Sequence, residues 1–317
     1  RRVIAAIEMD GDRARVVGGA VRNTLIGVPV DDVDIATTAR PDVVASRATA
    51  AGLKAVPTGI AHGTVTVVSS GRPFEVTTLR TDVETNGRHA VVAFTRDWAD
   101  DAGRRDFTMN AIYADADGCL HDPVGGIVDA LAGRVRFIGD PAERIKEDYL
   151  RILRFFRFHA RYGRGALDPA GLEATVARQD GIGRLSRERV GTEMRKLITA
   201  NGAVAALAIM EETGILARIL PGGGVLARLA TMIKLSARHD VPLGLEARFA
   251  GLAADRPALA GALRLSGRED RRIETIAHWG DQLAARMDEA TVRLAVVRAG
   301  NEAASAALLF AAAERGC

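Results

Sequence analysis

The placement of strand-like segments along the chain limits its fold more than any other feature. Short alternating or apolar runs, which are typical of strands, lie in the first part of the chain: "ARVV" at 14–17, "DVDIAT" at 32–37 and "GTVTVVSSGRPFEVTTLR" at 63–80. The last run is centred on Ser-Gly-Arg-Pro and predicts a hairpin. Between the strands, "GGAVRNTLIG" predicts a turn into a helix, and "PDVVASRATAAG" predicts a second helix.

Beyond about residue 139, the spacing of apolar residues predicts helices alone. The clearest of them cover 141–162, 168–179 and 186–200, and a series of Ala-, Leu- and Arg-rich helices continues to the end. We therefore predict an α+β fold, in which a small mixed-sheet head is followed by an all-helical neck, body and tail.

These patterns also suggest domain limits, because 317 residues exceed one ordinary domain. We place the head at 1–122, the helical neck at 123–200 and the helical body and tail at 201–317. Residues 81–103 are polar and poorly periodic. That length is unusual for a loop inside a compact domain, so we expect a mobile or functional loop there.

Composition restricts the class of protein and its surroundings. The net charge of +3 and the predominance of arginine among the cations are compatible with nucleic-acid binding without requiring it. The two cysteines, Cys119 and Cys317, belong to no Cys-x-x-Cys or His/Cys motif, so we expect neither a zinc site nor a disulfide framework. We find no secretory signal and no apolar run of about 18 residues, the length of a membrane helix. We expect a reducing, cytoplasmic location and no membrane partner.

Two glycines mark the first candidate site. Gly18 and Gly19 lie between a predicted strand and a predicted helix, where main-chain N–H groups can approach a phosphate closely. Arg22 follows on the first helical turn and is placed to reach the same anion. The alternative is an ordinary tight turn, and the glycine pair alone does not decide between the two.

Two carboxylates follow the glycine turn. Asp32 and Asp34 are expected to point to one face of a strand, with Val33 buried on the other. Carboxylates so close together repel each other unless a cation lies between them, and hard divalent ions such as Mg²⁺ prefer oxygen ligands. Glu75, on a later strand, is the candidate third carboxylate if the two strands are neighbours. An outward-facing surface glutamate is the alternative.

Two further Asp-x-Asp pairs have a different interpretation. "DGDR", with Asp10 and Asp12, and "DADG", with Asp115 and Asp117, contain glycine and lie between strand-like runs. Asp and Gly are favoured at such places by backbone geometry. We predict that both pairs form hairpin turns.

Several motifs occur in an order that is specific to one family. The glycine turn, a helix and Asp-x-Asp on a strand resemble the polymerase-beta-like nucleotidyltransferase superfamily. They are followed by "RRDFTMNAIY" (104–113), "DPVGGIVDALAGRVRFIGDP" (122–141), "EDYLRILRFFRF" (147–158) and "SRERVGTEMRKL" (186–197). Together these motifs resemble the class II bacterial CCA-adding tRNA nucleotidyltransferases and their poly(A) polymerase relatives. The resemblance covers about residues 15–200, and the remainder is similar only in being helical.

The resemblance implies an activity and a cofactor. Such an enzyme is a CTP/ATP:tRNA nucleotidyltransferase, which adds or repairs the 3′-terminal CCA of tRNA without a nucleic-acid template and releases pyrophosphate. It uses two-metal chemistry, with Mg²⁺ held here by Asp32 and Asp34 and with Glu75 as a further catalytic carboxylate. The implied partners are tRNA, CTP and ATP, and no obligate protein partner is expected. The family usually has Asp where this chain has Asn23, whose role is left open.

The resemblance also implies a set of nucleotide-binding residues around the Arg-Arg-Asp run. Arg105 and Asp106 would contact the sugar hydroxyls, with Arg104 nearby and Asn110 in the same set. The alternative for Asp106 is an N-cap at the start of the helix that ends near Tyr113, and it can serve both purposes.

The predicted 141–162 helix carries a candidate base-reading pair. Asp148 and Arg151 are three residues apart and would project side by side. Asp only accepts hydrogen bonds and Arg only donates them, so the pair fits the edges of C and A. U and G would leave polar groups unpaired, at about 1–3 kcal/mol each. The resemblance assigns the same task to this motif, with Glu147 orienting Arg151 and Arg154 reaching the base or phosphates. The alternative is an intrahelical salt bridge worth about 0.2–0.5 kcal/mol.

Other functions stay open at this point. One is the related activity of a poly(A) polymerase, or of an enzyme that adds only A or only C; another is a non-catalytic RNA-binding homologue. The helices of 201–317 are expected to hold the tRNA elbow and acceptor arm by shape and phosphate contacts. The candidate phosphate contacts are Arg218, Arg228, Arg238 and Arg248, each with a solvated helix face as the alternative.

Overall fold

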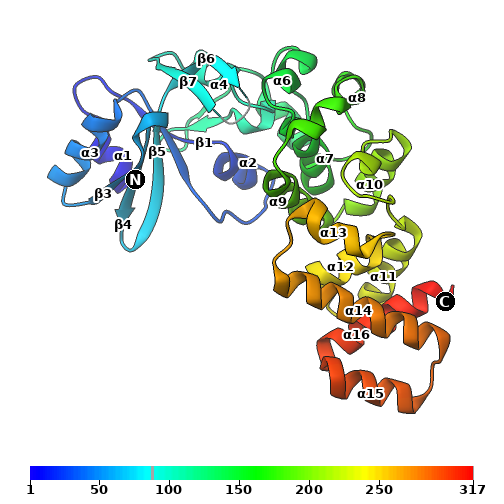
Figure 1. Cartoon of the computed structure of the whole chain (residues 1–317). Helices are drawn as coiled ribbons and strands as arrows, with labels where there is room; N and C mark the ends of the chain where they lie inside the picture. Colours follow the sequence, from blue (N-terminus) through cyan, green and yellow to red (C-terminus); the bar gives the residue numbers. More distant parts are fainter. Residues whose placement is uncertain (87–88, 317) are drawn as a thin grey trace. The chain divides into compact units, whose positions relative to one another are not determined.

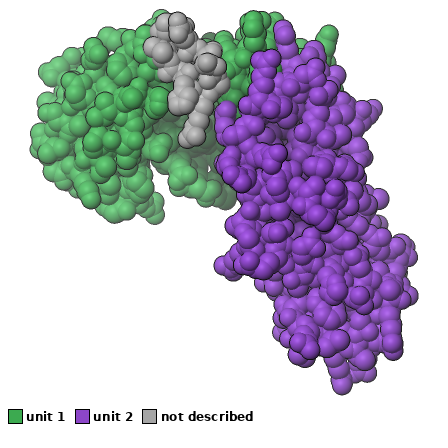
Figure 2. Space-filling view, in the orientation of Figure 1, with its two compact units in different colours: residues 1–151, 162–175 green, residues 152–161, 176–317 purple. Residues whose placement is uncertain are grey.

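The computed structural model describes residues 1–86 and 89–316 and divides the chain into two compact units (Figure 2). The first unit contains residues 1–151 and 162–175, and the second contains residues 152–161 and 176–317. All strands of the described chain lie in the first unit, and the second is built from helices (Figure 1). The predicted α+β fold, a mixed-sheet head followed by helices, is therefore confirmed.

The first unit is organised around a mixed sheet. Its strands are β1 (Ala14–Val17), β2 (Asp34–Thr37), β3 (Lys54–Gly59), β4 (Thr64–Ser69), β5 (Arg72–Thr78), β8 (Tyr113–Ala114) and β9 (Leu120–His121), and in the described residues they pair in the order β3-β4-β5-β2-β1-β8-β9. Only β2 and β5 are parallel neighbours among these pairs. The predicted hairpin over 63–80 is confirmed as β4 and β5, which are joined by a left-handed turn at Ser70 and Gly71.

Helices cover the sheet and extend the first unit. They are α1 (Arg2–Ile7), α2 (Gly19–Leu25), α3 (Pro41–Ala50), α4 (Trp98–Gly103), α5 (Gly126–Ala132) and α6 (Pro141–Glu147), with short 3₁₀ turns η1 (Ile60–His62) and η2 (Thr108–Asn110). Two more helices, α7 (Leu150–Tyr162) and α8 (Pro169–Ala177), contribute residues to both units. One core cluster packs Ile7 of α1 and Val44 of α3 against Ile35, Val65 and Val76 of the sheet.

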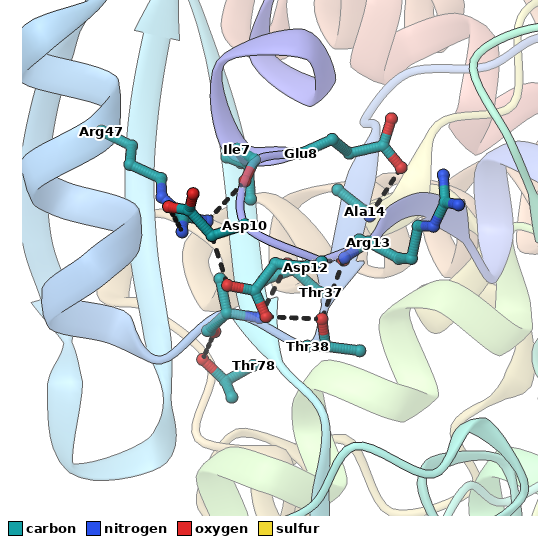
Figure 3. Close-up of polar contacts among 12 residues, drawn as sticks. Ile7, Glu8, Asp10, Asp12, Arg13, Ala14, Thr37, Thr38, Arg47 and Thr78 are labelled. Atoms are coloured by element: carbon teal, nitrogen blue, oxygen red, sulfur yellow. Dashed lines mark hydrogen bonds and ion pairs between the residues drawn. The ribbon is translucent and has the colours of Figure 1, made fainter.

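Asp12 fixes the turn between α1 and β1 beside this core. Its carboxylate accepts hydrogen bonds from Thr38 Oγ1 at 2.9 Å and from Arg47 Nη1 at 3.0 Å (Figure 3). Arg96 Nη1 donates to the same carboxylate at 2.8 Å. Asp10 adopts the left-handed conformation with φ of 51°. The prediction that Asp10 and Asp12 lie in a turn is confirmed, but the turn links a helix to a strand and is not a hairpin.

The expectation of a loop over 81–103 is wrong. Strands β6 (Arg80–Asn86) and β7 (His89–Phe94) form a separate antiparallel pair, and α4 begins four residues later at Trp98. Sequence periodicity does not reveal the pair, because β6 is mostly polar and the apolar residues of β7 do not alternate with polar ones. Asp97 caps α4, since its Oδ1 accepts the Ala99 N–H at 2.8 Å.

The second unit consists of consecutive helices and their connections. After η3 (Gln179–Arg184), the helices are α9 (Arg187–Ile198), α10 (Ala203–Glu212), α11 (Leu226–His239), α12 (Leu245–Leu252), α13 (Arg256–Leu263), α14 (Gly267–Ala285), α15 (Glu289–Ala299) and α16 (Asn301–Glu314), with η4 (Leu216–Arg218) between α10 and α11. Gly280 allows α14 and α16 to approach closely, because a Cβ there would lie 2.4 Å from the Phe310 ring. Within the described residues, no helix has both the length and the apolar character needed to cross a bilayer.

Arginines of the second unit that were candidates for phosphate binding also have partners within the protein. Arg228 donates to the carbonyl oxygens of Gly251 and Ala253, at the end of α12, at 2.8 and 2.7 Å. Arg248 Nη1 donates to the Ile198 carbonyl at 2.9 Å. These bonds give both side chains a structural task, and their contact with RNA stays a prediction.

Candidate active site

The two sheet carboxylates come together across parallel strands. β2 begins at Asp34, whose Cα is paired with that of Glu75 on β5. Asp32 precedes β2 and Val33 is only half-buried, so the expectation that both aspartates lie within a strand around a buried valine is wrong. The side chains of Asp32, Asp34 and Glu75 are all exposed, and negative charge therefore accumulates at one accessible place on the sheet.

This accumulation changes the ionisation of Asp34. Protein atoms around the carboxyl replace part of its water and raise its pKa, and the negative charges of Glu75 and Asp32 raise the pKa further. Arg105 opposes them and lowers the pKa of Asp34, but the net direction is upward. The carboxylates are thus incompletely neutralised by the protein, which is the condition under which a divalent cation is attracted.

The glycine turn lies at the same end of the central strands as these carboxylates. Gly18 directly follows Val17, the residue of β1 that pairs with Asp34. Its φ of 72° and ψ of −123° fall in a region that only glycine adopts readily. A Cβ at this position would lie 3.5 Å from the Asn110 carbonyl oxygen and 3.7 Å from Arg105 Nη1. The turn is therefore packed against the Arg-Arg-Asp segment.

The N–H groups of the two glycines differ in their use. Gly18 donates its N–H to the Ile112 carbonyl at 3.1 Å. Gly19 begins α2, and the first N–H groups of a helix have no partner within it. Of the two, Gly19 is the residue whose N–H is suited to meet an anion, while Gly18 supplies the backbone conformation.

Arg22 holds the glycine turn to neighbouring segments. The side chain is 5% exposed, and its Nη1 donates to Asn110 Oδ1. Its Nη2 donates to Asn23 Oδ1 at 2.8 Å and to Tyr162 Oη at 2.8 Å. Asn23 in turn donates from Nδ2 to the Pro29 carbonyl at 2.8 Å. Asn23 thus connects Arg22 to the loop that leads to Asp32. An aspartate at this position would keep the first bond and lose the second.

Asp106 and Asn110 form the adjoining part of the site. Asp106 is 8% exposed, and its Oδ1 accepts hydrogen bonds from the Phe107 N–H at 2.8 Å and from Asn110 Nδ2 at 2.9 Å. These bonds tie Asp106 to η2, whose N-cap residue is Phe107, and Tyr113 begins β8; the alternative of a helix that ends near Tyr113 with Asp106 as its N-cap is therefore wrong. The contacts join the glycine turn, Arg22 and the Arg-Arg-Asp segment in one network within the first unit.

Asp101 is a functional candidate that the sequence patterns did not reveal. It is 1% exposed, and it accepts hydrogen bonds from Arg104 Nη2 at 2.6 Å, from Arg105 Nη2 at 3.0 Å and from Tyr113 Oη at 2.8 Å. Burial alone would raise the pKa of Asp101, but the positive charges of Arg105 and Arg104 lower it. The available signal was the helical i, i+3, i+4 spacing of Asp101, Arg104 and Arg105.

The predicted 141–162 helix is interrupted at the candidate base-reading pair. α6 ends at Glu147, α7 begins at Leu150, and Asp148 has an extended backbone with φ of −153°. Asp148 Oδ1 accepts the Leu150 N–H at 3.1 Å, so it caps α7. The expectation of one continuous helix, with Asp148 and Arg151 on its face, is therefore wrong.

Arg151 is nevertheless held close to the Arg-Arg-Asp segment. Its Nη1 donates to Glu147 Oε2 at 2.5 Å and to the Arg144 carbonyl at 2.8 Å, and its Nη2 donates to the Arg104 carbonyl at 3.2 Å. A polar pocket of about 180 Å³ lies beside these groups and is lined by Thr81, Asp100, Gly103, Arg104, Arg144 and Glu147. The structure thus brings Glu147 and Arg151 together as expected.

Arg154 is the predicted site residue that falls in the other unit. Its guanidinium lies 4.0 Å from Glu193 of α9, whose carboxylate also accepts a hydrogen bond from Arg157 Nε. A role of Arg154 at the nucleotide stays a prediction.

Comparison with known proteins identifies two family regions in the chain. Residues 14–136 match the poly(A) polymerase head domain. Residues 166–224 match a region described as the probable RNA- and SrmB-binding site of polymerase A.

Two curated relatives show the extent of the similarity. The human mitochondrial CCA tRNA nucleotidyltransferase 1 is 45% identical over 193 residues, which are 59% of this chain and 44% of that protein. The CCA-adding enzyme of Geobacillus stearothermophilus is 40% identical over 242 residues, or 76% of this chain and 58% of that protein. The chain spans about half the length of these relatives.

A solved structure matches nearly the whole chain. The crystal structure of the Bacillus stearothermophilus CCA-adding enzyme in complex with CTP superimposes with a TM-score of 0.82 at 34% identity. The match covers 99% of this chain and 77% of that one.

Proposed function

The chain belongs to the family of CCA-adding tRNA nucleotidyltransferases and poly(A) polymerases, and we propose that it builds or repairs the 3′-terminal CCA of tRNA. In this reaction CMP and AMP pass from CTP and ATP to the 3′-hydroxyl of the RNA, and pyrophosphate leaves. The observation that carries the proposal is the pairing of Asp34 with Glu75 beside the Gly18 turn.

Mg²⁺ is the cofactor that these residues fit best. Asp32, Asp34 and Glu75 offer only carboxylate oxygens, and the raised pKa of Asp34 is consistent with negative charge that the protein leaves uncompensated. We assign Asp32 and Asp34 as the metal ligands and Glu75 as the third catalytic carboxylate. When bound, the metal supplies Lewis-acid activation of the attacking oxygen and neutralises charge on the leaving pyrophosphate.

The protein's own groups would position the nucleotide. Gly19 offers a main-chain N–H to the triphosphate, and Gly18 gives the turn its shape. Arg105 lies against that turn, and Asp106 is fixed beside Asn110, which suits a pair that contacts the sugar hydroxyls. Arg104 would assist from the neighbouring position.

Arg22 is better suited to positioning than to direct phosphate binding. Its guanidinium already donates to Asn23, Asn110 and Tyr162. We propose that it fixes the glycine turn relative to Asn110, so that phosphate and sugar sites keep their spacing. It would therefore affect nucleotide binding through other residues.

Base selection would use Asp148 and Arg151. Asp148 Oδ1 is held by the Leu150 N–H at the start of α7, and Arg151 is held by Glu147; we propose that the two side chains meet at the base of the bound nucleotide. An acceptor next to a donor matches the Watson–Crick edges of C and A and leaves U and G with unpaired groups. The pair would stand in for a nucleic-acid template, and Arg154 would support the base or the phosphates.

The helical parts would bind the tRNA. We keep the division into a head at 1–122, a neck at 123–200 and a body and tail at 201–317 as our proposal. The match of residues 166–224 to a probable RNA-binding region supports contact with RNA in this part of the chain. Duplex RNA is recognised mainly through its shape and phosphates.

The experiment is incorporation of labelled CTP and ATP into tRNA that lacks its 3′ end, with Mg²⁺ and with a chelator. We expect incorporation of both nucleotides that depends on Mg²⁺ and on Asp34, with Asp34→Asn as the inactive control. Long tracts of A would instead identify a poly(A) polymerase, and one base alone would identify an A- or C-adding enzyme. RNA binding with no incorporation would identify a non-catalytic homologue and overturn the proposal.

A further inference from the structure

The hairpin of β8 and β9 carries three different metal-ligating side chains, away from the carboxylates described above. Tyr113 pairs with His121, and the Asp115 N–H donates to the Cys119 carbonyl at 2.9 Å, so Asp115 lies opposite Cys119. Side chains alternate along a strand, which places Asp115, Cys119 and His121 on one face of the hairpin. A carboxylate oxygen, the thiol sulfur and an imidazole nitrogen all lie within 4.8 Å of one another.

The Asp115 side chain is already fixed by its neighbours. Arg15 Nε donates to Asp115 Oδ1 at 2.8 Å, and the Arg15 guanidinium lies over the Trp98 ring at 4.2 Å from its centre. The other carboxylate oxygen, Oδ2, lies 2.7 Å from His121 Nε2. Arg15 thus orients the carboxylate so that Oδ2 faces the imidazole, as outer-shell partners do at metal sites.

The backbone of the turn between β8 and β9 positions Cys119. Gly118 donates its N–H to the Asp115 carbonyl at 3.0 Å, and the Cys119 N–H donates to Asp117 Oδ1 at 3.0 Å. The prediction that Asp115 and Asp117 form a hairpin turn is confirmed by this geometry. Cys119 is exposed, so a cation can reach its sulfur from solvent.

Contrary to the expectation from the cysteine spacing, we propose that Asp115, Cys119 and His121 form a binding site for a borderline-soft divalent cation, Zn²⁺. Zinc takes sulfur at about 2.3 Å and nitrogen or oxygen at about 2.0 Å, so its ligand atoms lie roughly 3–4 Å apart. Small side-chain rotations bring the three groups to that spacing, and a water completes four-fold coordination. Mg²⁺ prefers oxygen ligands and is excluded by the thiolate and imidazole.

A cation bound at this site would hold the last two strands of the sheet together. β8 and β9 form its outer edge, with β8 paired to β1 and β9 paired to β8 alone in the described sheet order. A cation that joins Asp115 to Cys119 and His121 clamps the two strands together. The positive charge of Arg15 opposes the cation, so the affinity is expected to be lower than that of a closed four-ligand zinc site. The proposal is independent of the nucleotidyl-transfer function.

The test uses Co²⁺ as a spectroscopic substitute for zinc in a Cys317→Ser background, which leaves Cys119 as the remaining thiol. We expect a thiolate-to-cobalt charge-transfer band in the near ultraviolet that one equivalent of Zn²⁺ removes. Cys119→Ser should abolish the band, and His121→Ala should weaken Co²⁺ binding by at least about tenfold. Asp34→Asn should leave the band unchanged, because the sheet carboxylates contain no sulfur.

Three results would overturn the proposal: no band in the Cys317→Ser protein, a band that persists in Cys119→Ser, or unchanged Co²⁺ affinity in His121→Ala. The last would mean that an exposed thiol binds the cation by itself. Circular dichroism of each variant verifies the fold. Zn²⁺ should also raise the melting temperature of the Cys317→Ser protein, and Cys119→Ser should remove that increase.

Discussion

The carboxylate of Asp101 accepts two hydrogen bonds from the guanidinium of Arg105, at 3.2 Å from Nε and 3.0 Å from Nη2. The same arginine lies against Gly18 and lowers the pKa of Asp34. Asp101, which is 1% exposed, therefore fixes a cation that lies against the glycine turn and acts on one of the sheet carboxylates. We infer that Asp101 is a positioning residue.

Asp101→Asn tests this inference. The variant keeps the shape of the side chain but removes its charge, so Arg104 and Arg105 lose their ionic partner. We expect the free energy of unfolding to fall by about 3 kcal/mol, the scale of a broken buried ion pair. In steady-state kinetics we expect KM for CTP and ATP to rise more than kcat falls, with weaker discrimination against deoxynucleotides. Exposed Asp42→Asn is the matched control, and unchanged nucleotide selectivity in Asp101→Asn would leave Asp101 with a structural role only.

Asp34→Asn should lower the catalytic activity and raise the stability of the metal-free protein. The pKa of Asp34 is raised in the folded protein, so the ionised form costs stability at neutral pH, and the cost disappears as the pH falls through that pKa. The variant lacks this cost, so without Mg²⁺ it should melt at a higher temperature than the wild type at pH 7, with the difference shrinking in acid. Loss of a metal ligand should lower kcat at least about a hundredfold. A lower melting temperature at pH 7 would contradict this electrostatic account.

Gly18→Ala should disturb the turn that follows β1. Alanine avoids the region of φ 72° and ψ −123°, so we expect a loss of about 1–3 kcal/mol in stability together with a higher KM for CTP and ATP. Gly27→Ala is the control, because Gly27 also has a positive φ and a Cβ added there would meet no atom within 4 Å. It should lose stability without a change in KM. Equal KM values in the two variants would show that the Gly18 turn does not hold the triphosphate.

Asp148→Asn should relax the choice of base. The amide can donate as well as accept, so the penalty against U and G falls. A penalty of about 1–3 kcal/mol per unpaired group corresponds to roughly 5- to 150-fold in kcat/KM. We expect the ratio of CTP to UTP incorporation to fall by that order. Asp168→Asn is the matched control, because it makes the same carboxylate-to-amide change at a side chain that accepts the Gly171 N–H at the start of α8. An unchanged ratio in Asp148→Asn would refute its role in base selection.

The parts of the fold set by local patterns were predictable. The β4–β5 hairpin has a Ser-Gly turn between alternating runs, and the strand before Gly18 is short and apolar, so both follow from periodicity. The interruption at Asp148 was missed because Ile145, Ile152 and Phe156 keep a helical spacing across it. Periodicity does not detect a break of two residues when the apolar pattern continues.

Contacts between distant segments were the less predictable part of the site. That Asp34 lies beside Glu75 depends on the parallel pairing of β2 with β5, and strand order cannot be read from either strand alone. The role of Asp101 cannot be predicted from the sequence, because a buried acid in the middle of polar residues has no apolar pattern to mark it. Its role became visible only through the bonds to Arg104 and Arg105.

The most direct test uses three tRNA transcripts, which end before CCA, after C and after CC, each incubated with Mg²⁺ and one nucleotide at a time. The account predicts addition of C to the first two, addition of A to the third, and arrest once CCA is complete. Continued addition of A, or equal use of all four nucleotides on every transcript, would contradict it.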